Sequence, residues 1–264
     1  MSLISYADTS VAPLDLVIPF SPEALFGAAD NGYYFDFSDI NTLFHDTAGT
    51  VPITASGQTV ARVNDKSGKG NHLTQATVAN QPRYIEEGGK KFLRFDGSDM
   101  LLSATARSFN VDPVDFMAVA RETSEVVSAG VFVEGVPATN DWTTPQGFVL
   151  TTSTTAVLMQ VAGFAFALNA NSNGAGAMPK SNVEMRRAGT IARAFRDGVQ
   201  LGGNATVAAG TTVANAQLVV GARMLAAGPG TYFFNGDIGG VFRISRTLSA
   251  LENNTLRTFM DALL

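Results

Sequence analysis

The chain of 264 residues contains no cysteine and only two histidines, His45 and His72. Without cysteine there is neither a disulfide framework nor a thiolate metal site, which fits assembly in a reducing cytoplasm. Neither histidine belongs to a paired metal-binding motif. We therefore assign both to surface or packing roles rather than to catalysis or metal binding.

Charge is also scarce. Charged residues make up 16% of the chain, against about 25% in an average globular protein, and the net charge is -5. Basic residues cluster no further than Lys90-Lys91 and Arg186-Arg187, so we expect neither nucleic acid nor an anionic membrane as a partner. Residues 1–26 lack a positively charged start and a long apolar run, so we expect no signal peptide and no membrane insertion.

Common catalytic motifs are absent too. There is no G-x-S-x-G, H-E-x-x-H or P-loop pattern. Glycoside hydrolysis uses two carboxylates, and on one strand these share a face only at a spacing of two or four residues. Glu122 and Glu125 are three apart and would face opposite sides. We therefore predict no catalytic residue and predict that the chain is not an enzyme.

Short runs of alternating apolar residues fill most of the sequence. Tyr33, Phe35 and Phe37 share one face, with Tyr34 and Asp36 on the other, which is the period of a half-buried strand. Such spacing, without helical patterns between the runs, predicts an antiparallel sandwich. The other runs are 115–121, 126–133, 148–151, 156–161, 164–168, 183–187, 191–196 and 218–222.

One helix is predicted, over residues 249–264. Ser249 and Glu252 form a capping box, and Leu248 is placed to staple the helix start. A single helix cannot bury an apolar stripe alone, so it lies against the sandwich or against a neighbouring chain. The stripe consists of Leu256, Phe259, Met260 and Leu263.

The stretch from Arg62 to Ser103 has the densest turn signals. Asp65 to Asn71, DKSGKGN, predicts a tight loop in which Asp65 and Asn71 bond the loop's own amides. Gln81-Pro82 enforces an extended chain. Asp96-Gly97 predicts the turn of a β-hairpin.

Two blocks of the sequence carry a family resemblance. The first joins residues 65–82, of the form DKSGxGNHxTQxTxxxQP, to LRFDGSDMLLS at 93–103, and the second runs from Phe234 to Glu252. Both resemble the concanavalin A-like (laminin G-like) jelly-roll domains of bacteriophage virion and tail-fibre proteins. The resemblance implies an all-β fold, a two-sheet antiparallel jelly-roll sandwich of the concanavalin A-like lectin/glucanase type, with a C-terminal α-helix.

Residues 1–27 precede this family-like sequence and contain Pro13, Pro19 and Pro22, which forbid a long helix. We interpret residues 1–27 as an extended arm for attachment or oligomerisation, and residues 28–264 as the jelly roll. The alternative is that this segment is simply the first strand of the sandwich.

The resemblance also implies a candidate calcium site. Relatives often hold one ion with the acids of the FDG motif and an Asp of the last strand, and Asp96, Asp99 and Asp237 offer suitable oxygens here. Gly239 stands where the family's last strand has its Asp. We therefore expect no metal and no cofactor, with calcium as the single candidate. The alternative is three turn aspartates.

A sugar site needs an exposed aromatic ring with polar neighbours. Asn140, Asp141 and Trp142 place the only tryptophan among such residues, and Tyr232 follows a glycine-rich segment. These four are the predicted ligand-binding residues. The alternative for Trp142 is that it plugs the rim of the sandwich.

Three functions follow from the resemblance. We favour a virion component, made in the host cytoplasm and displayed outside the cell as a homo-oligomer, that binds host-surface polysaccharide and contacts other virion proteins through its arm. The second is a purely structural adaptor or decoration module, and the third is a glycan hydrolase.

Removal of residues 1–27 tests the arm. An extended segment without packing would cost about 1–2 kcal/mol per residue in backbone entropy, so we expect it to order only against a partner. Size-exclusion chromatography with light scattering should show an oligomer for the full chain and a monomer for a chain that begins at Ala28. Equal masses, together with a large loss of thermal stability, would instead identify the segment as a strand of the sandwich.

Overall fold

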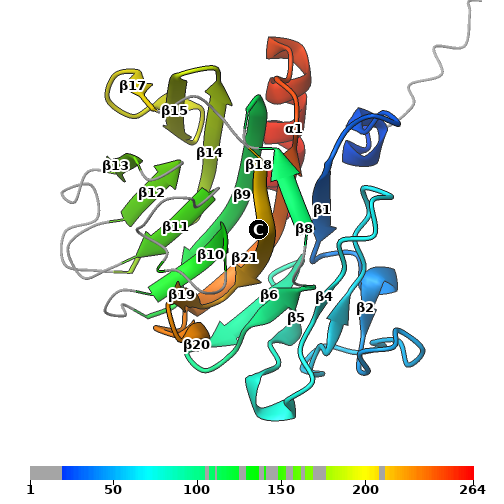
Figure 1. Cartoon of the computed structure of the whole chain (residues 1–264). Helices are drawn as coiled ribbons and strands as arrows, with labels where there is room; N and C mark the ends of the chain where they lie inside the picture. The colour runs from blue at the N-terminus through cyan, green and yellow to red at the C-terminus, as the bar shows by residue number, and fades with distance from the viewer. Residues whose placement is uncertain are drawn as a thin grey trace, which may run out of the picture.

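The computed structural model describes residues 20–104, 107–110, 112–124, 129–136, 140, 148–152, 157–161, 164–168, 177–207 and 212–264. In these residues two antiparallel β-sheets pack face to face, and an α-helix covers the outer face of one of them (Figure 1). This arrangement confirms the predicted all-β sandwich with a C-terminal helix. No helix in these ranges is long and apolar enough to span a membrane.

The first sheet has β9 and β21 at its centre. Its strands in spatial order are β16 (Val199–Gln200), β15 (Ile191–Arg196), β14 (Ser181–Ala188), β9 (Val114–Glu122), β21 (Asn235–Ile244), β6 (Lys90–Asp96) and β5 (Arg83–Glu87). Two more strands lie off this path: β1 (Gly32–Asp36) pairs with β21, and β17 (Ala205–Thr206) pairs with β15.

The second sheet is built around β10 and β18. Its order is β13 (Phe164–Leu168), β12 (Val157–Val161), β11 (Phe148–Thr152), β10 (Ala129–Gly135), β18 (Thr212–Val220), β7 (Leu101–Ser103), β4 (Leu73–Thr74), β3 (Arg62–Val63) and β2 (Leu43–Phe44), with β8 (Arg107–Asn110) also on β18. A separate hairpin joins β19 (Arg223–Leu225) to β20 (Gly228–Thr231) within the glycine-rich segment before Tyr232. Three short 3-10 turns complete the order, η1 (Pro22–Leu25), η2 (Ile40–Thr42) and η3 (Val78–Asn80).

Strand β1 is buried on both faces, not half-buried as its alternation suggested. Tyr33 and Phe35 belong to the core between the sheets. Tyr34, on the other face, packs with Phe242 and Met260 in a second apolar cluster beneath the helix. The helix therefore converts what would be a solvent face into a second core.

The helix, α1 (Ala250–Ala262), begins with the predicted capping box of Ser249 and Glu252. It lies against its own sandwich, which confirms one of the two predicted positions. A polar contact also fixes it to β14, because Arg257 donates to both carboxylate oxygens of the fully buried Glu184. Helix and sheet are thus joined by an apolar stripe and by a charged anchor.

The loop at residues 65–71 forms as predicted, with a different partner for Asn71. The carboxylate of Asp65 accepts hydrogen bonds from the backbone amides of Ser67 and Asn71, and also from that of Tyr34 in β1. The side chain of Asn71 donates to the carbonyl of Gly32 instead of a loop amide. The loop therefore clamps the start of β1.

The Asp96-Gly97 turn does not make the predicted hairpin. Strand β6 before it pairs with β5 and β21 in the first sheet, whereas β7 after it pairs with β4 and β18 in the second. Gly97 has the positive φ (92°) of a tight turn. The dipeptide thus marks a turn, but this turn carries the chain from one sheet to the other.

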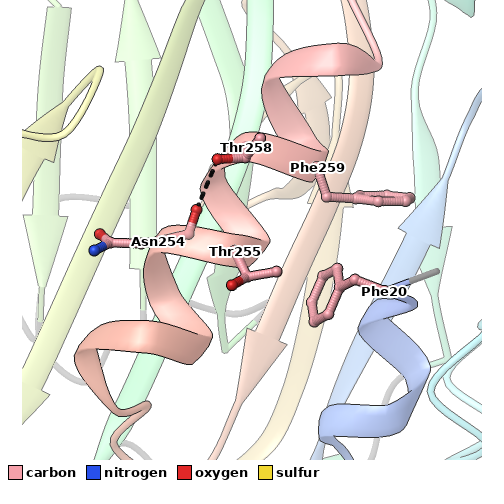
Figure 2. Close-up of a pocket in the computed structure, with 5 residues that line it drawn as sticks. All are labelled: Phe20, Asn254, Thr255, Thr258 and Phe259. Carbon is pink, nitrogen blue, oxygen red and sulfur yellow. Dashed lines mark hydrogen bonds between the residues drawn. The ribbon is translucent and has the colours of Figure 1, made fainter. Parts of the chain in front are cut away.

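Residues 20–27, the described part of the proposed arm, pack on the domain. The rings of Phe20 and Phe259 meet edge to face with centroids 6.0 Å apart, and a pocket of about 520 Å³ opens beside them along α1 (Figure 2). Leu25 and Phe26 join the cluster beneath the helix. Residues 1–19 lie outside the described residues, so the attachment role stays a prediction. A chain that begins at Phe20 tests that role without removing these contacts.

A buried ion pair crosses the core between the sheets. Arg243 of β21 and Glu134 of β10 are fully buried, with Nε 2.8 Å from Oε2. The hydroxyl of Tyr33 donates to the same Glu134 oxygen at 2.7 Å, and the guanidinium of Arg243 lies 4.7 Å from the ring centroid of Phe109. Each sheet therefore contributes one charge to a site that water does not reach.

Replacement of one partner of this pair should be costly. We expect Arg243→Met to lower the free energy of unfolding by about 3–5 kcal/mol, because Glu134 is left buried without its countercharge. Urea denaturation should show a much smaller loss when Glu134→Leu is added. Arg83→Met, at an exposed position of β5, is the control. If Arg243→Met alone were as stable as the variant that carries both Arg243→Met and Glu134→Leu, this explanation would be wrong.

Candidate functional site

The β19–β20 hairpin rests on the outer face of the second sheet. Val133 of β10 and Val219 of β18 point away from the main core and form a small apolar cluster with Met224 of β19. The contact is close at Gly130, where a β-carbon would lie 2.4 Å from the backbone of Ala222. Apolar side-chain contacts and a close backbone approach therefore hold the hairpin against β10 and β18.

Tyr232, directly after β20, combines exposure with an unfavourable backbone. Its φ is 53°, in the left-handed region, which costs a bulky residue about 1–2 kcal/mol. Its side chain is 49% exposed, so burial of the ring does not offset this cost. Its carbonyl accepts from the amide of Gly130 at 2.9 Å, which fixes the backbone against β10. Such conformations concentrate at functional sites.

Arg223, which opens β19, lies beside this ring. Its guanidinium carbon is 5.2 Å from the ring centroid of Tyr232, which is cation–π geometry. The pairing of Arg223 with Thr231 brings the two side chains together. Arg223 could not be found from the sequence. It lies beside Tyr232 because it pairs with Thr231 in the β19–β20 hairpin, and that hairpin was not predicted.

Asn140 meets the other end of the same hairpin. Its Oδ1 accepts from the amide of Ala226 in the turn between β19 and β20, at 2.9 Å. Asn140 and Tyr232, two of the four predicted ligand-binding residues, thus lie at opposite ends of one hairpin. Asp141 and Trp142 lie outside the described residues, and the binding role of all four stays a prediction. We call Tyr232 and Arg223, which do lie side by side, the hairpin site.

The three aspartates of the implied calcium site form ion pairs and hydrogen bonds with groups of the protein. Asp237 is fully buried, with Oδ1 2.7 Å from Nε of Arg94 and Oδ2 2.8 Å from Nη2 of Arg121. Asp96 accepts from Ser98, and Asp99 accepts from the amide of Asp96. Within the described ranges, no three acids or histidines are grouped so that they could hold a metal ion.

Asp99 should make stability depend on pH. It is nearly buried, and burial raises its pKa to about 7. The folded protein then binds this proton more tightly than the unfolded chain, so stability falls as pH rises from about 4 to about 7. Asp99→Asn keeps an acceptor for the amide of Asp96 and should flatten this fall in urea denaturation at pH 5 and 8.

Asp96→Asn is the control for that measurement. The hydrogen bond from Ser98 lowers the pKa of Asp96, so its contribution to the pH dependence has the opposite sign. If the Asp99 variant lost as much stability between the two pH values as the unaltered protein, Asp99 would not be the group responsible.

Comparisons with known proteins identify the fold and no family. No protein-family model and no curated protein sequence matches the chain. Among solved structures, a Trypanosoma rangeli sialidase aligns with TM-score 0.57 and 15% identity over 88% of this chain, and a second structure of it with TM-score 0.54, 15% and 86%. This chain spans only 33% and 37% of those sialidase chains.

A third solved structure matches over nearly its whole length. Domain 4 of a GH43 extracellular arabinanase from Geobacillus stearothermophilus, in complex with arabinotriose, aligns with TM-score 0.52 and 9% identity over 88% of this chain and 98% of that domain. Identities this low establish a shared sandwich fold only. The concanavalin A-like resemblance thus holds at the level of fold, and its bacteriophage part stays a prediction.

These neighbours correct the prediction that the chain is not an enzyme. That prediction rested on absent motifs, yet the same sandwich occurs in a sialidase and a GH43 arabinanase. The absence of a familiar motif from this sequence is therefore no ground for excluding catalysis.

Proposed function

We propose that this chain is a carbohydrate-binding module that holds its ligand at the hairpin site. The observation that carries the proposal is Tyr232, an exposed aromatic ring kept in a left-handed backbone conformation beside an arginine. A residue that only closed a turn would be glycine or asparagine, which adopt this conformation at little cost.

The chemistry of the site suits a sugar. The face of an aromatic ring packs on the apolar face of a pyranose, and a tyrosine ring loses little entropy on binding because it has only two side-chain torsions. Arg223 supplies several hydrogen-bond donors for ring hydroxyls. The bond between the Tyr232 carbonyl and Gly130 pre-organises the ring, which lowers the entropic cost of binding.

The structural neighbours support a carbohydrate ligand at a coarse level. The arabinanase domain is a module of similar extent in complex with arabinotriose, and one structure of the sialidase is in complex with sialic acid. A module of this fold that binds glycan is consistent with both.

The biological setting is a further part of the proposal. We propose that the module is displayed on a bacteriophage virion as a homo-oligomer, where it binds host-surface polysaccharide and contacts other virion proteins through residues 1–19. The two sequence blocks at 65–103 and 234–252 support this assignment. Tail, baseplate or capsid genes beside its gene would agree with it, and a neighbourhood free of phage genes would oppose it.

Tyr232→Asn tests the site. Asparagine tolerates the left-handed backbone, so we expect the free energy of unfolding to change by about 1 kcal/mol or less, while the stacking surface is lost. On a glycan array followed by titration of the best ligand, affinity should fall by about 10-fold or more, since stacking and a cation–π pair each contribute about 1 kcal/mol.

Two further variants complete the experiment. Leu251→Ala removes an exposed apolar side chain from α1, on the other sheet, and should leave glycan affinity unchanged. Trp142→Ala tests the second predicted platform separately. Binding that survives Tyr232→Asn would refute the hairpin site. Binding of no glycan at all would favour the structural adaptor.

A further inference from the structure

A second pocket lies on the first sheet, apart from the hairpin site on the second. Its volume is about 220 Å³. Strands β9, β14 and β15 and the segment before α1 form it, through Asp115, Arg186, Arg187, Arg193, Thr247 and Leu248. We call it the arginine pocket.

Three charged residues of this pocket form one row across the sheet. Asp115 of β9 is the register partner of Arg186 in β14, and Arg186 is the partner of Arg193 in β15. Directly opposed residues of neighbouring antiparallel strands share a face, so the two arginines stand side by side. Like charges in that position destabilise a sheet unless an anion lies between them.

The row contains a buried carboxylate oxygen without a partner. Asp115 is 3% exposed, and its Oδ2 accepts from the amide of Leu248 at 2.7 Å. Its Oδ1 is buried and has no hydrogen-bond partner in the part of the chain that the structure describes. A buried acceptor left unsatisfied costs about 1–3 kcal/mol, so a ligand that donates a hydrogen bond here would gain from it.

Three arginines line the pocket beside Asp115, and Glu184 forms an ion pair with Arg186 next to it. Nε of Arg186 is buried and lacks an acceptor among the described residues, although its Nη2 contacts Glu184 and Asn253. Arg187 is 3% exposed, and its Nε donates to the carbonyl of Gly189. Arg193 is exposed at the pocket edge, where Nε donates to Asn204. A bound anion would offset the cost of this arrangement.

We propose that the arginine pocket binds the carboxylate-bearing sugar unit of an acidic glycan. The carboxylate lies against Arg186 and Arg193, and a ring hydroxyl donates to Oδ1 of Asp115. A single chemical group would not satisfy both ends of the row, because a simple carboxylate such as acetate has no donor for Asp115 and a neutral sugar has no charge for the arginines. The volume suits one sugar unit, being below the roughly 300–1,000 Å³ of sites for larger ligands.

The probes are D-glucuronate and D-glucose, which differ in the carboxylate. Calorimetric titration of the full chain should show glucuronate binding at least about 10-fold more tightly than glucose, since a hydrogen-bonded charge pair contributes about 1.5–3 kcal/mol. Arg193→Gln, at an exposed position that leaves the fold intact, should remove most of this preference. Arg83→Gln, on the opposite edge of the same sheet, is the matched control and should change nothing.

Asp115→Asn separates the proposed ligand from a plain anion. The asparagine keeps an acceptor for the amide of Leu248 but places a donor where Oδ1 was. Glucuronate affinity should therefore fall, while acetate, which has no donor to lose and only meets less repulsion, should bind equally well or better. If glucuronate affinity also rises, or if acetate matches glucuronate in the unaltered protein, the pocket is a simple anion site and the proposal is wrong.

Tyr232→Asn keeps this test independent of the hairpin site. Glucuronate binding at the arginine pocket should be unchanged in that variant. If Tyr232→Asn abolished glucuronate binding and Arg193→Gln did not, the acidic sugar would bind at the hairpin site and the proposal would fail, whereas the proposed function would stand.

Discussion

The buried pair of Arg243 and Glu134 sets how the two sheets face each other. Arg243 comes from the central strand of one sheet and Glu134 from a central strand of the other, and neither charge reaches water. A lateral slip of one sheet over the other would separate the charges inside an apolar core, at a cost of several kcal/mol. Apolar contacts tolerate such slips far better. The ion pair thus fixes the position of one sheet relative to the other. Strand β10, which carries Glu134, also carries Gly130, whose amide donates to the carbonyl of Tyr232.

The sequence was most informative where structure is local. The strand at Gly32–Asp36, the capping box of Ser249 and Glu252, and the amide-binding role of Asp65 each depend on residues a few positions apart, and each forms as predicted. The Asp96-Gly97 turn marks the limit. A turn signal fixes a reversal of the chain, but pairing partners far along the chain decide which sheet the next strand joins.

The sites show the same division. Tyr232 could be found from its own neighbours, because an aromatic residue after a glycine-rich segment is a local pattern. Arg223 could not, since it requires the β19–β20 register. The row of Asp115, Arg186 and Arg193 requires two registers at once, and Arg186-Arg187 was noticed only as a weak basic pair. The second buried face of β1 was missed for a related reason, because it depends on where α1 docks.

The position of β21 has a consequence for the order of folding. This strand, at residues 235–244, lies between β9 and β6 and also pairs with β1, where Tyr33 meets Arg243. Strands β1, β6 and β9 therefore lack this neighbour until residues 235–244 have left the ribosome. Contacts between residues so far apart in the sequence form slowly. Until β21 has paired with them, the earlier strands expose unpaired edges. A ribosome that stopped short of residue 235 would release a chain without the middle of its first sheet, so chains cut short there should be removed by proteolysis or aggregation rather than persist as partly folded modules.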